Sequence, residues 1–371
     1  MSPASTPAAS SPSASPRLLV AASGTGGHLF PAIATAEALL REGYNIEWLG
    51  VPDRLETTLV PKHFPLHTVG MAGFQGRPGL GTIKTLVKFG RATVQVRQLL
   101  KKGGFDGVFT TGGYIAAPAI LAARSLGLPA VLHESNALPG KVTRWLSPRC
   151  TVVALGFEVA QSYLPKAAKT VVVGTPVRDE FLTPEPPALT DPNLPDGVPL
   201  IVVVGGSQGA VAVNQLVRAA APAWIDAGAW IVHQTGSNDP DADSYSHPHY
   251  IHRPFFGSMA ALMNRATLAI GRSGAGTLTE LAISRTPSIL IPYPFAAEDH
   301  QTVNAQAFVD AHAALMLNQS QIVPSEFQSL VLDLLAEPDR LETMAAAAGS
   351  LATADSATKL ADLIQQVVLN R

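Results

Sequence analysis

Two short glycine-rich segments have the composition of anion-binding loops. Residues 23–28 are Ser-Gly-Thr-Gly-Gly-His, and residues 205–210 are Gly-Gly-Ser-Gln-Gly-Ala. Each comes directly after a predicted strand and directly before a predicted helix. Glycine lets the backbone turn tightly and approach an anion, and a helix N-terminus offers unpaired N–H groups and a positive dipole. One such loop could be a tight turn without a ligand, but two loops, one in each half of the chain, favour phosphate binding.

The first loop does not satisfy the dinucleotide-binding pattern G-x-G-x-x-G. Counting from Gly24 and Gly26 places Leu29 where the pattern requires its last glycine. A dehydrogenase that transfers hydride is therefore the less favoured interpretation.

A third segment, residues 271–280, combines small residues with a carboxylate. It reads Gly-Arg-Ser-Gly-Ala-Gly-Thr-Leu-Thr-Glu. It follows a predicted strand and opens a predicted helix, so it is another candidate anion site. Within that helix, the carboxylate of Glu280 could accept hydrogen bonds from both hydroxyls of a ribose, or it could lie on a solvated helix face. After the next predicted strand, residues 292–304 form a polar cluster at a strand's carboxyl end, where open α/β sheets bind ligands.

His28 ends the first loop and is a candidate general base. A neutral imidazole suits proton removal at neutral pH, and the alternative is that His28 only helps to position phosphate at the helix start. Asp241-Ala-Asp243 is similar to a metal-binding Asp-x-Asp motif, but it lies in a polar loop with no strand directly before it. We interpret this motif, together with His247 and His249, as solvated surface rather than as metal ligands.

Alternating strand and helix patterns must position these segments. In the first half, apolar runs predict strands at residues 17–23, 45–50, 107–111, 130–133, 151–154 and 170–173, with helices that include 30–42 and 83–102. After a proline-rich stretch the pattern restarts, with strands at 200–204, 230–234, 268–271 and 288–291 and helical structure over 340–371. This alternation predicts an α/β fold with parallel sheets, and a chain of 371 residues suits two such units.

The expected organisation has five parts. They are a disordered Ser/Pro/Ala tail over residues 1–16, a Rossmann-like domain over 17–182, a linker over 183–197, a second Rossmann-like domain over 198–345, and a helical segment over 346–371 that could pack back on the first domain. The tail has neither the basic nor the apolar region of a secretory signal. The prolines of the linker cannot continue a helix or a central strand.

Composition excludes several classes of protein. Apolar residues make up 47% of the chain and charged residues 15%, which is typical of a globular protein. A net charge of −2 gives no reason to expect nucleic acid as a partner. The single cysteine, Cys150, excludes an internal disulfide and suits a reducing cytosol. The apolar stretch between Asp106 and Arg124 contains glycines and a proline, so any membrane contact must be peripheral.

One segment is strongly basic. Between Thr57 and Phe105 there is no Asp or Glu, and eight basic residues give a local charge of +8: Lys62, Arg77, Lys84, Lys88, Arg91, Arg97, Lys101 and Lys102. The rest of the chain therefore carries −10. Apolar residues are interleaved with them: Phe74, Leu80, Ile83, Leu86, Val87 and Phe89. Such a surface suits anionic lipid, each basic residue contributing roughly 1 kcal/mol, although an ordinary helix with its apolar face in the core is the alternative. We predict that segment 62–102 contacts an anionic membrane.

Seven motifs, in their order along the chain, resemble the MurG family of glycosyltransferases. They are Gly-Thr-Gly-Gly-His at 24–28, Thr-Gly-Gly-Tyr at 111–114, His-Glu-Ser-Asn at 133–136, Gly-Thr-Pro-Val-Arg at 174–178, Gly-Gly-Ser-Gln-Gly at 205–209, Arg-Ser-Gly-Ala at 272–275 and Asp-His-Gln-Thr-Val-Asn-Ala at 299–305. The resemblance runs from about Arg17 to the end of the chain. Each motif alone is unspecific, but the combination is highly specific.

The resemblance implies a GT-B fold, with two Rossmann-like domains facing each other across a cleft. It implies metal-independent, inverting transfer of N-acetylglucosamine from UDP-N-acetylglucosamine to the 4-hydroxyl of the muramyl sugar of lipid I. The product would be lipid II for peptidoglycan synthesis, which serves cell-wall biogenesis, cell shape and cell division. No cofactor is implied beyond the sugar-nucleotide substrate. The partners would be polyprenyl-linked lipid I and the cytoplasmic face of the bacterial inner membrane, with no nucleic acid.

Carried over by position, the resemblance implies a role for each candidate residue. His28 would deprotonate the acceptor hydroxyl. Thr25, Gly26 and Gly27 would face the donor and the acceptor pyrophosphate. Asn136 and Arg178 would approach the donor sugar and diphosphate, and Ser207 would bind a phosphate. The backbone of Phe256 would contact uracil, and Gln301 would contact the sugar hydroxyls. The diphosphate and ribose would lie on the run Ala275, Gly276, Thr277, Leu278, Thr279 and Glu280, with Glu280 on the ribose.

Two positions depart from the family pattern, and three other functions remain open. Thr175 stands where asparagine is common, and Gln75 stands where a basic residue is usual in the acceptor loop. The alternatives are a GT-B transferase acting on diacylglycerol, a UDP-sugar epimerase, and a non-catalytic nucleotide-sugar-binding scaffold at the membrane. We predict that the second loop, with Ser207 and the helix that begins at Ala275, holds the donor, and that the first loop, ending in His28, faces the lipid-linked acceptor.

Overall fold

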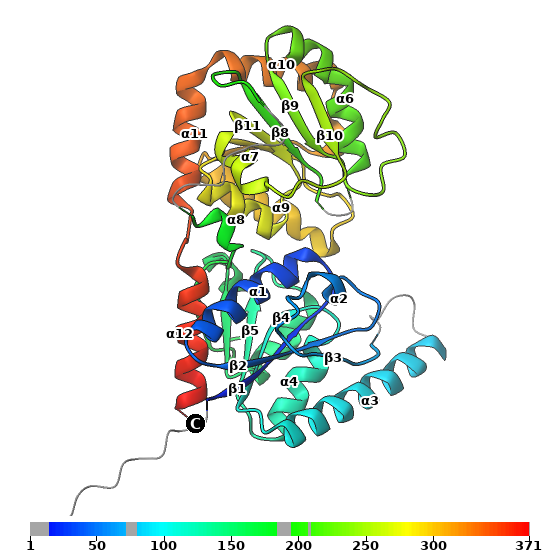
Figure 1. Cartoon of the computed structure of the whole chain (residues 1–371), viewed down its shortest axis with the longest axis vertical. Coiled ribbons are helices and arrows are strands. Elements are labelled where there is room, and N and C mark those ends of the chain that lie inside the picture. Colours follow the sequence, from blue (N-terminus) through cyan, green and yellow to red (C-terminus); the bar gives the residue numbers. More distant parts are fainter. Residues whose placement is uncertain (1–14, 72–79, 184–193, 207–208, 371) are drawn as a thin grey trace, which may run out of the picture.

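Two parallel sheets, one above the other along the long axis, form the framework of the molecule (Figure 1). The computed structural model describes residues 15–71, 80–183, 194–206 and 209–370. Residues 1–14 of the predicted tail and 184–193 of the predicted linker lie outside the described residues. The strand order is β3-β2-β1-β4-β5-β6-β7 in the first sheet and β10-β9-β8-β11-β12-β13 in the second.

The first unit contains the elements of residues 17–181. Its strands are β1 Arg17–Ala22, β2 Asn45–Gly50, β3 Leu66–Thr68, β4 Gly107–Gly112, β5 Ala130–Glu134, β6 Val152–Leu155 and β7 Thr170–Val172. Its helices are α1 Gly26–Arg41, α2 Glu56–Leu59, α3 Leu80–Gly103, α4 Ala116–Ser125 and α5 Lys141–Leu146, with 3-10 turns η1 Ser147–Arg149, η2 Glu158–Tyr163 and η3 Asp179–Phe181.

The second unit begins at β8. Its strands are β8 Leu200–Val204, β9 Trp230–Gln234, β10 Tyr250–Arg253, β11 Leu268–Gly271, β12 Ser288–Leu290 and β13 Ala314–Met316. Its helices are α6 Val211–Asp226, α7 Met259–Arg265, α8 Ala275–Ile283, α9 His300–Asp310, α10 Pro324–Ala336, α11 Pro338–Ser350 and α12 Ser356–Leu369, with 3-10 turns η4 Ala297–Asp299 and η5 Gln319–Gln321.

Every strand predicted from an apolar run is present, with bounds that differ by one residue at most. The helix predicted at 30–42 begins earlier, at Gly26, because the glycine loop itself enters the helix. Three strands were not predicted: β3, β10 and β13. They have three or four residues and lie at sheet edges, where half-exposed residues make the apolar run too short to recognise.

Each central strand contributes to two cores, one on each face of its sheet. In β1, Leu18 and Val20 belong to one apolar cluster, whereas Leu19 and Ala21 belong to another. The residues of β8 alternate in the same way between two clusters of the second unit. Successive side chains of a strand point to opposite faces, so a strand covered on both sides must be apolar throughout. This is why the central strands read as unbroken apolar runs.

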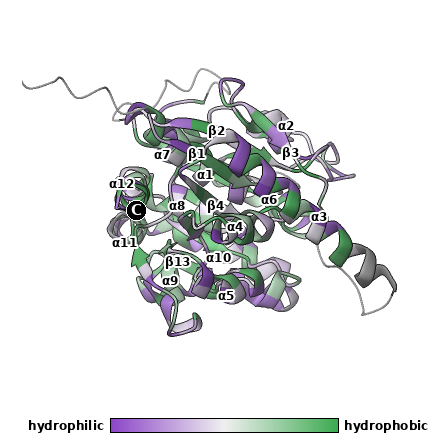
Figure 2. Cartoon of the chain, turned by 90° about the horizontal axis from the view of Figure 1, so that it is seen from below, coloured by the Kyte–Doolittle hydropathy of each residue, from purple (hydrophilic) through white to green (hydrophobic). Residues whose placement is uncertain are grey.

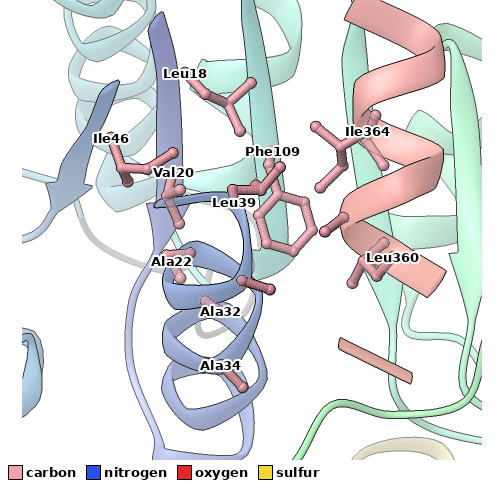
Figure 3. Packing of buried hydrophobic residues seen from close by; sticks show 14 of the residues in the cluster. Leu18, Val20, Ala22, Ala32, Ala34, Leu39, Ile46, Phe109, Leu360 and Ile364 are labelled. Carbon is pink, nitrogen blue, oxygen red and sulfur yellow. The ribbon is translucent and has the colours of Figure 1, made fainter. Parts of the chain in front are cut away.

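The last helix, α12, leaves the second unit and packs on the first. Figure 3 shows Leu360 and Ile364 of α12 directed toward Phe109 of β4 and Leu39 of α1, and all four are fully buried. The hydroxyl of Ser356, at the start of α12, also donates to the carbonyl of Thr175 at 3.0 Å. Residues 351–355 therefore carry the chain back to the unit in which it began.

Helix α3 extends away from the body of the first unit, as both views of the molecule show (Figures 1 and 2). Its 24 residues correspond to about 36 Å. Ala92, Val96 and Leu100 on one side are buried against the sheet. No helix within the described residues is long and apolar enough to cross a membrane.

Candidate active site

Both glycine-rich loops follow the central strands of their sheets. The strand order reverses at one point in each sheet, between β1 and β4 in the first and between β8 and β11 in the second. Open parallel sheets bind ligands outside the carboxyl ends of the strands at such a point. Residues 23–28 follow β1 and residues 113–114 follow β4, while residues 205–206 follow β8 and residues 272–274 follow β11. All four segments therefore lie at the ligand-binding position of this fold.

The loop after β1 carries His28, and the end of β4 orients its ring. Nδ1 of His28 lies 2.8 Å from the carbonyl oxygen of Thr111, and the Thr111 hydroxyl donates to the His28 carbonyl at 2.7 Å. A carbonyl oxygen can only accept, so Nδ1 carries the proton and donates it. Nε2 then holds a lone pair, which is what a general base needs. The sequence placed Thr111 in a motif, but gave it no role.

Gly112 lies against this imidazole and leaves no space for a side chain. Its φ is +112°, and a Cβ atom built on it would lie 2.9 Å from Nδ1 of His28. Any other residue would strain the backbone and displace the ring from Thr111. The lack of a side chain at Gly112 therefore helps to keep the His28 ring in its orientation toward Thr111.

A buried carboxylate accepts a backbone hydrogen bond from the first glycine loop. Thr25 is the N-cap of α1, and both Thr25 and Gly27 are exposed, whereas Gly26 is half-buried. Glu56 is fully buried and accepts the N–H of Gly24 at 3.2 Å and a second backbone N–H at 2.8 Å. Glu56 was not predicted from the sequence, because the contact joins residues 32 positions apart.

The segment predicted to bind diphosphate forms the first turns of α8. Ala275 and Leu278 are buried, while Gly276, Thr277 and Thr279 are half-buried. Leu278 is enclosed in the core of the second unit, so it can contact a ligand only through its backbone. The first N–H groups of a helix have no partner within the helix and suit an anion. The arrangement allows the predicted contacts to come from the helix start rather than from side chains.

Arg178 and Glu280 lie 102 positions apart and form an ion pair. Nη2 of Arg178 lies 2.9 Å from Oε1 of Glu280, and its Nη1 lies 2.6 Å from Oε1 of Glu180. Burial raises the pKa of the Glu280 carboxyl, and the guanidinium of Arg178 opposes that rise. The Glu280 side chain is only 13% exposed, so the alternative of a solvated helix face is wrong.

Asn136 is connected to the second unit through Asn304 of α9, which is fully buried. Nδ2 of Asn304 donates to Oδ1 of Asn136 at 3.1 Å and to the carbonyl of Ser273 at 3.2 Å. Its Oδ1 accepts the N–H of Ala137 at 2.7 Å. On the other side, Glu134 accepts two hydrogen bonds from Asn136, at 3.1 and 2.9 Å. The sequence placed Glu134 and Asn304 inside motifs, but gave neither a role.

Three further predicted residues belong to the second unit. Oε1 of Gln301 accepts the N–H of Tyr293 at 2.9 Å. The side chain of Phe256 is buried in the core, and its N–H donates to Oε1 of Gln234 at 3.3 Å, so a ligand could meet only the backbone there. Ser207 lies outside the described residues.

The Asp-x-Asp motif lies on the surface. Asp241 and Asp243 are exposed, and His247 and His249 are half-buried in the same loop. In the part of the chain that the structure describes, no three His, Cys, Asp or Glu side chains are grouped closely enough to hold a metal ion.

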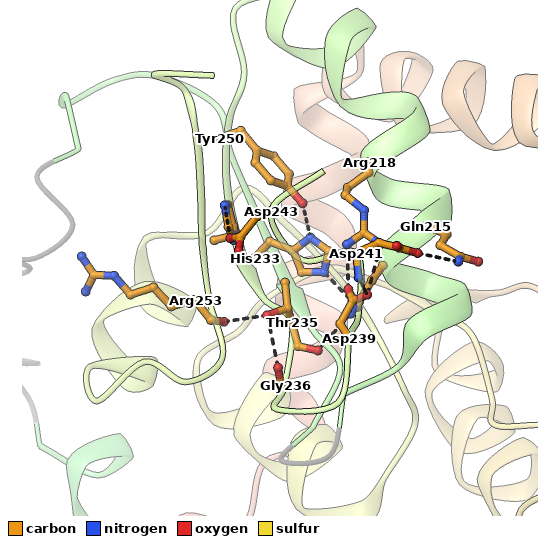
Figure 4. Close-up of polar contacts among 12 residues, drawn as sticks. Gln215, Arg218, His233, Thr235, Gly236, Asp239, Asp241, Asp243, Tyr250 and Arg253 are labelled. Atoms are coloured by element: carbon orange, nitrogen blue, oxygen red, sulfur yellow. Dashed lines mark hydrogen bonds and ion pairs between the residues drawn. The ribbon is translucent and has the colours of Figure 1, made fainter. Parts of the chain in front are cut away.

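A buried polar network fixes the segment on which the second glycine loop rests (Figure 4). Gly209 has a φ of +83°, and a Cβ on it would lie 2.4 Å from the carbonyl oxygen of Thr235. Asn214 donates to that same carbonyl at 2.9 Å and to Asp239 at 2.7 Å. Asp239 is paired with Arg218 at 2.7 Å, and both side chains are buried. The loop after β9 is thereby held against the second glycine loop.

His233 completes the network as a neutral imidazole. Its Nδ1 lies 2.7 Å from the Tyr250 hydroxyl, and its Nε2 lies 3.0 Å from Oδ1 of Asn214. Burial, reinforced by the charge of Arg218, lowers the pKa of His233 to about 3. Burial alone would raise the pKa of Asp239, but hydrogen bonds from Arg218 and Asn214 outweigh it and lower that pKa.

Comparison with known families matches both units. The sequence profile of the glycosyltransferase family 28 N-terminal domain matches residues 18–155, and that of the glycosyltransferase family 28 C-terminal domain matches residues 200–367. The chain is 62% identical, over 95% of its length and 98% of the relative's, to the UDP-N-acetylglucosamine--N-acetylmuramyl-(pentapeptide) pyrophosphoryl-undecaprenol N-acetylglucosamine transferase of Nostoc punctiforme.

Solved structures are similar over nearly the whole chain. The crystal structure of Acinetobacter baumannii MurG aligns with a TM-score of 0.76 and 31% identity, covering 95% of this chain and 99% of that one. The glycosyltransferase of kitacinnamycin aligns with a TM-score of 0.70 over 95% of this chain and 99% of its own, but at 15% identity this likeness shows the fold alone. The predicted α/β fold of the GT-B type, with two Rossmann-like domains, is confirmed.

Replacing His233 with glutamine should flatten the acid dependence of stability. Below about pH 6.5 the unfolded chain binds a proton at this histidine, whereas the folded chain does not until about pH 3. The free energy of unfolding should therefore fall by about 1.4 kcal/mol per pH unit on acidification because of this group. The unfolding free energy, measured with urea between pH 4 and 7, should depend less steeply on pH in His233→Gln than in the native protein. The difference in slope should correspond to at most one proton. Replacement of the exposed His312 by asparagine is the control, and an unchanged slope in His233→Gln would contradict the buried, neutral state of His233.

Proposed function

Because the chain belongs to the MurG family of glycosyltransferases, we propose that it transfers N-acetylglucosamine from UDP-N-acetylglucosamine to the 4-hydroxyl of the muramyl sugar of lipid I, with inversion, forming lipid II. The observation that carries this proposal is the 62% identity to a transferase of that name over 95% of the chain. The reaction would take place on the cytoplasmic face of the bacterial inner membrane and serve peptidoglycan synthesis.

The proton step is assigned to His28. Nε2 takes the proton from the acceptor 4-hydroxyl while that oxygen forms its bond to the anomeric carbon and the bond from that carbon to UDP breaks. The Thr111 carbonyl, 2.8 Å from Nδ1, then accepts a hydrogen bond from a protonated ring and stabilises its charge. UDP leaves with its charge stabilised by the N-terminus of α8 and by Arg178. The step needs no cofactor, and UDP-N-acetylglucosamine enters as a substrate.

The remaining residues are proposed to bind rather than react. Thr25, Gly26 and Gly27 face the pyrophosphate groups, and Asn136 and Gln301 face the hydroxyls of the transferred sugar. Ser207 binds a phosphate, the backbone at Phe256 binds uracil, and Glu280 binds the ribose. The run Ala275, Gly276, Thr277, Leu278 and Thr279 cradles the diphosphate. The position of these segments at the two switch points supports this division of roles.

Replacing His28 with glutamine should lower kcat while leaving donor binding nearly unchanged. General-base catalysis contributes about 10²–10⁴-fold, so a loss of that size is expected. The measurement is transfer of radiolabel from UDP-N-acetylglucosamine to a lipid I analogue, with the half-exposed His63→Gln as the control variant.

The outcomes of that assay separate the hypotheses. An unchanged kcat in His28→Gln would overturn the base role and leave phosphate positioning as the role of His28. No transfer to lipid I by the native protein, or transfer to diacylglycerol instead, would overturn the proposed function. Donor binding without any turnover would favour a non-catalytic scaffold, and conversion of the sugar nucleotide without an acceptor would favour an epimerase.

We propose further that α3 contacts the anionic membrane that holds the acceptor. Lys88 and Arg91 are exposed, and the apolar side chains of Leu86, Val87 and Val94 are 53%, 48% and 54% exposed on the same helix. Phe89, by contrast, packs against the core. Of the other interleaved residues, the side chains of Phe74, Leu80 and Ile83 lie outside the described part. Exposed apolar residues next to basic ones suit the interface of an anionic bilayer.

Charge reversal on α3 should weaken membrane binding. In sedimentation with vesicles of phosphatidylcholine and phosphatidylglycerol, Lys88→Glu with Arg91→Glu should lower the bound fraction, because each basic residue contributes about 1 kcal/mol near such a surface. Lys166→Glu with Lys169→Glu reverses two exposed lysines outside this segment and is the matched control. Equal binding by both double variants would contradict a specific role for α3.

A further inference from the structure

Two carboxylates and two aromatic rings of the protein contact the guanidinium of Arg178. Its Nε and Nη2 both face Oε1 of Glu280, at 3.3 and 2.9 Å, and its Nη1 faces Glu180 at 2.6 Å. Cζ of Arg178 lies over the rings of Phe30 and Phe181, at 5.0 and 5.1 Å from their centroids. The Nε–Nη2 edge of a guanidinium can bind a phosphate through two parallel N–H···O bonds, and here the Glu280 carboxylate occupies that edge.

Glu280 depends on that contact in turn. Its side chain is 13% exposed, so its charge is largely removed from water. A buried carboxylate that loses a positively charged partner pays a large desolvation cost unless hydrogen-bond donors replace the guanidinium. Two ribose hydroxyls are donors of the right kind, because each can give an O–H to a carboxylate oxygen.

The geometry points to a ligand-exchange mechanism in which the Arg178–Glu280 pair selects ligands that carry both a diphosphate and a vicinal diol. The inference rests on the proposed function, which places the diphosphate near Arg178 and the ribose on Glu280. The diol donates hydrogen bonds to Glu280 in place of Arg178, so the Nε–Nη2 edge becomes free. The diphosphate then accepts hydrogen bonds from that edge of Arg178. The diol alone replaces the partner of Glu280 only, and the diphosphate alone replaces the partner of Arg178 only. Glu180, still 2.6 Å from Nη1, keeps Arg178 in place during the exchange.

This mechanism predicts that the two halves of the ligand assist each other even when they are not joined. Uridine that occupies Glu280 should strengthen the binding of inorganic pyrophosphate, and by linkage pyrophosphate should strengthen the binding of uridine by the same factor. A hydrogen bond to a charged group changes a binding constant by roughly tenfold or more, so a coupling of that size is expected. Without the exchange, two ligands that bind independently should show no coupling.

The test is calorimetric titration of the full chain with pyrophosphate, with and without saturating uridine. In the native protein, uridine should lower the Kd of pyrophosphate about tenfold, and 2′,3′-dideoxyuridine, which lacks the diol, should not. In Glu280→Gln, pyrophosphate alone should bind about tenfold more tightly than in the native protein, and the coupling should vanish. Glu337→Gln is the control: it removes a carboxylate of the second unit that pairs with Arg340 at 3.1 Å outside the predicted site, and it should keep the coupling.

Several results would overturn the inference. They are an unchanged pyrophosphate affinity in the presence of uridine, an equal effect of dideoxyuridine, and a gain in pyrophosphate affinity in Glu337→Gln as large as that in Glu280→Gln. Pyrophosphate alone could bind the native protein too weakly to measure. In that case its affinity for the Glu280→Gln variant is the deciding measurement, and no detectable binding of pyrophosphate to that variant refutes the exchange. A protein that transfers the sugar but shows no coupling refutes this inference alone. A protein that neither binds UDP nor transfers the sugar refutes the proposed function instead.

Discussion

The site depends on one fully buried side-chain amide, that of Asn304. Its oxygen accepts the N–H of Ala137 from the first unit, and its nitrogen donates both to Asn136 of the first unit and to the carbonyl of Ser273 in the second. A buried amide left without partners costs about 1–3 kcal/mol, so separating the units at this point is penalised. Helix α12, which packs on α1, makes another connection between the units. The loops of both units are therefore held together where a ligand would bind.

Much of the fold follows from the periodicity of the sequence. Strands buried on both faces, such as β8, must be apolar throughout, and such runs are easy to find. The edge strands β3, β10 and β13 were missed because a short, half-exposed strand has no distinctive pattern. The segment that contains α12 was expected to be helical and to be able to pack back on the first domain. Its particular contacts with Phe109 and Leu39 join residues some 250–320 positions apart, which no local pattern can show.

The candidate site was predictable to the extent that it consists of loops at strand ends. Motif positions located His28, Asn136, Arg178 and Glu280, and the geometry adds how these groups are held. What the sequence could not show are contacts between distant residues. The Thr111 carbonyl that sets the tautomer of His28 lies 83 positions away, and the two glycine loops give no sign of it. The roles of the site residues toward a substrate stay predictions.

The two glycine-rich loops are predicted to bind different partners, with the donor on the second unit and the acceptor on the first. The decisive measurement is a crystal structure with UDP-N-acetylglucosamine bound. We expect the diphosphate at the N-terminus of α8, the ribose on Glu280, and the anomeric carbon on the side of Nε2 of His28. A diphosphate bound instead to residues 24–27, with α8 unoccupied, would contradict it.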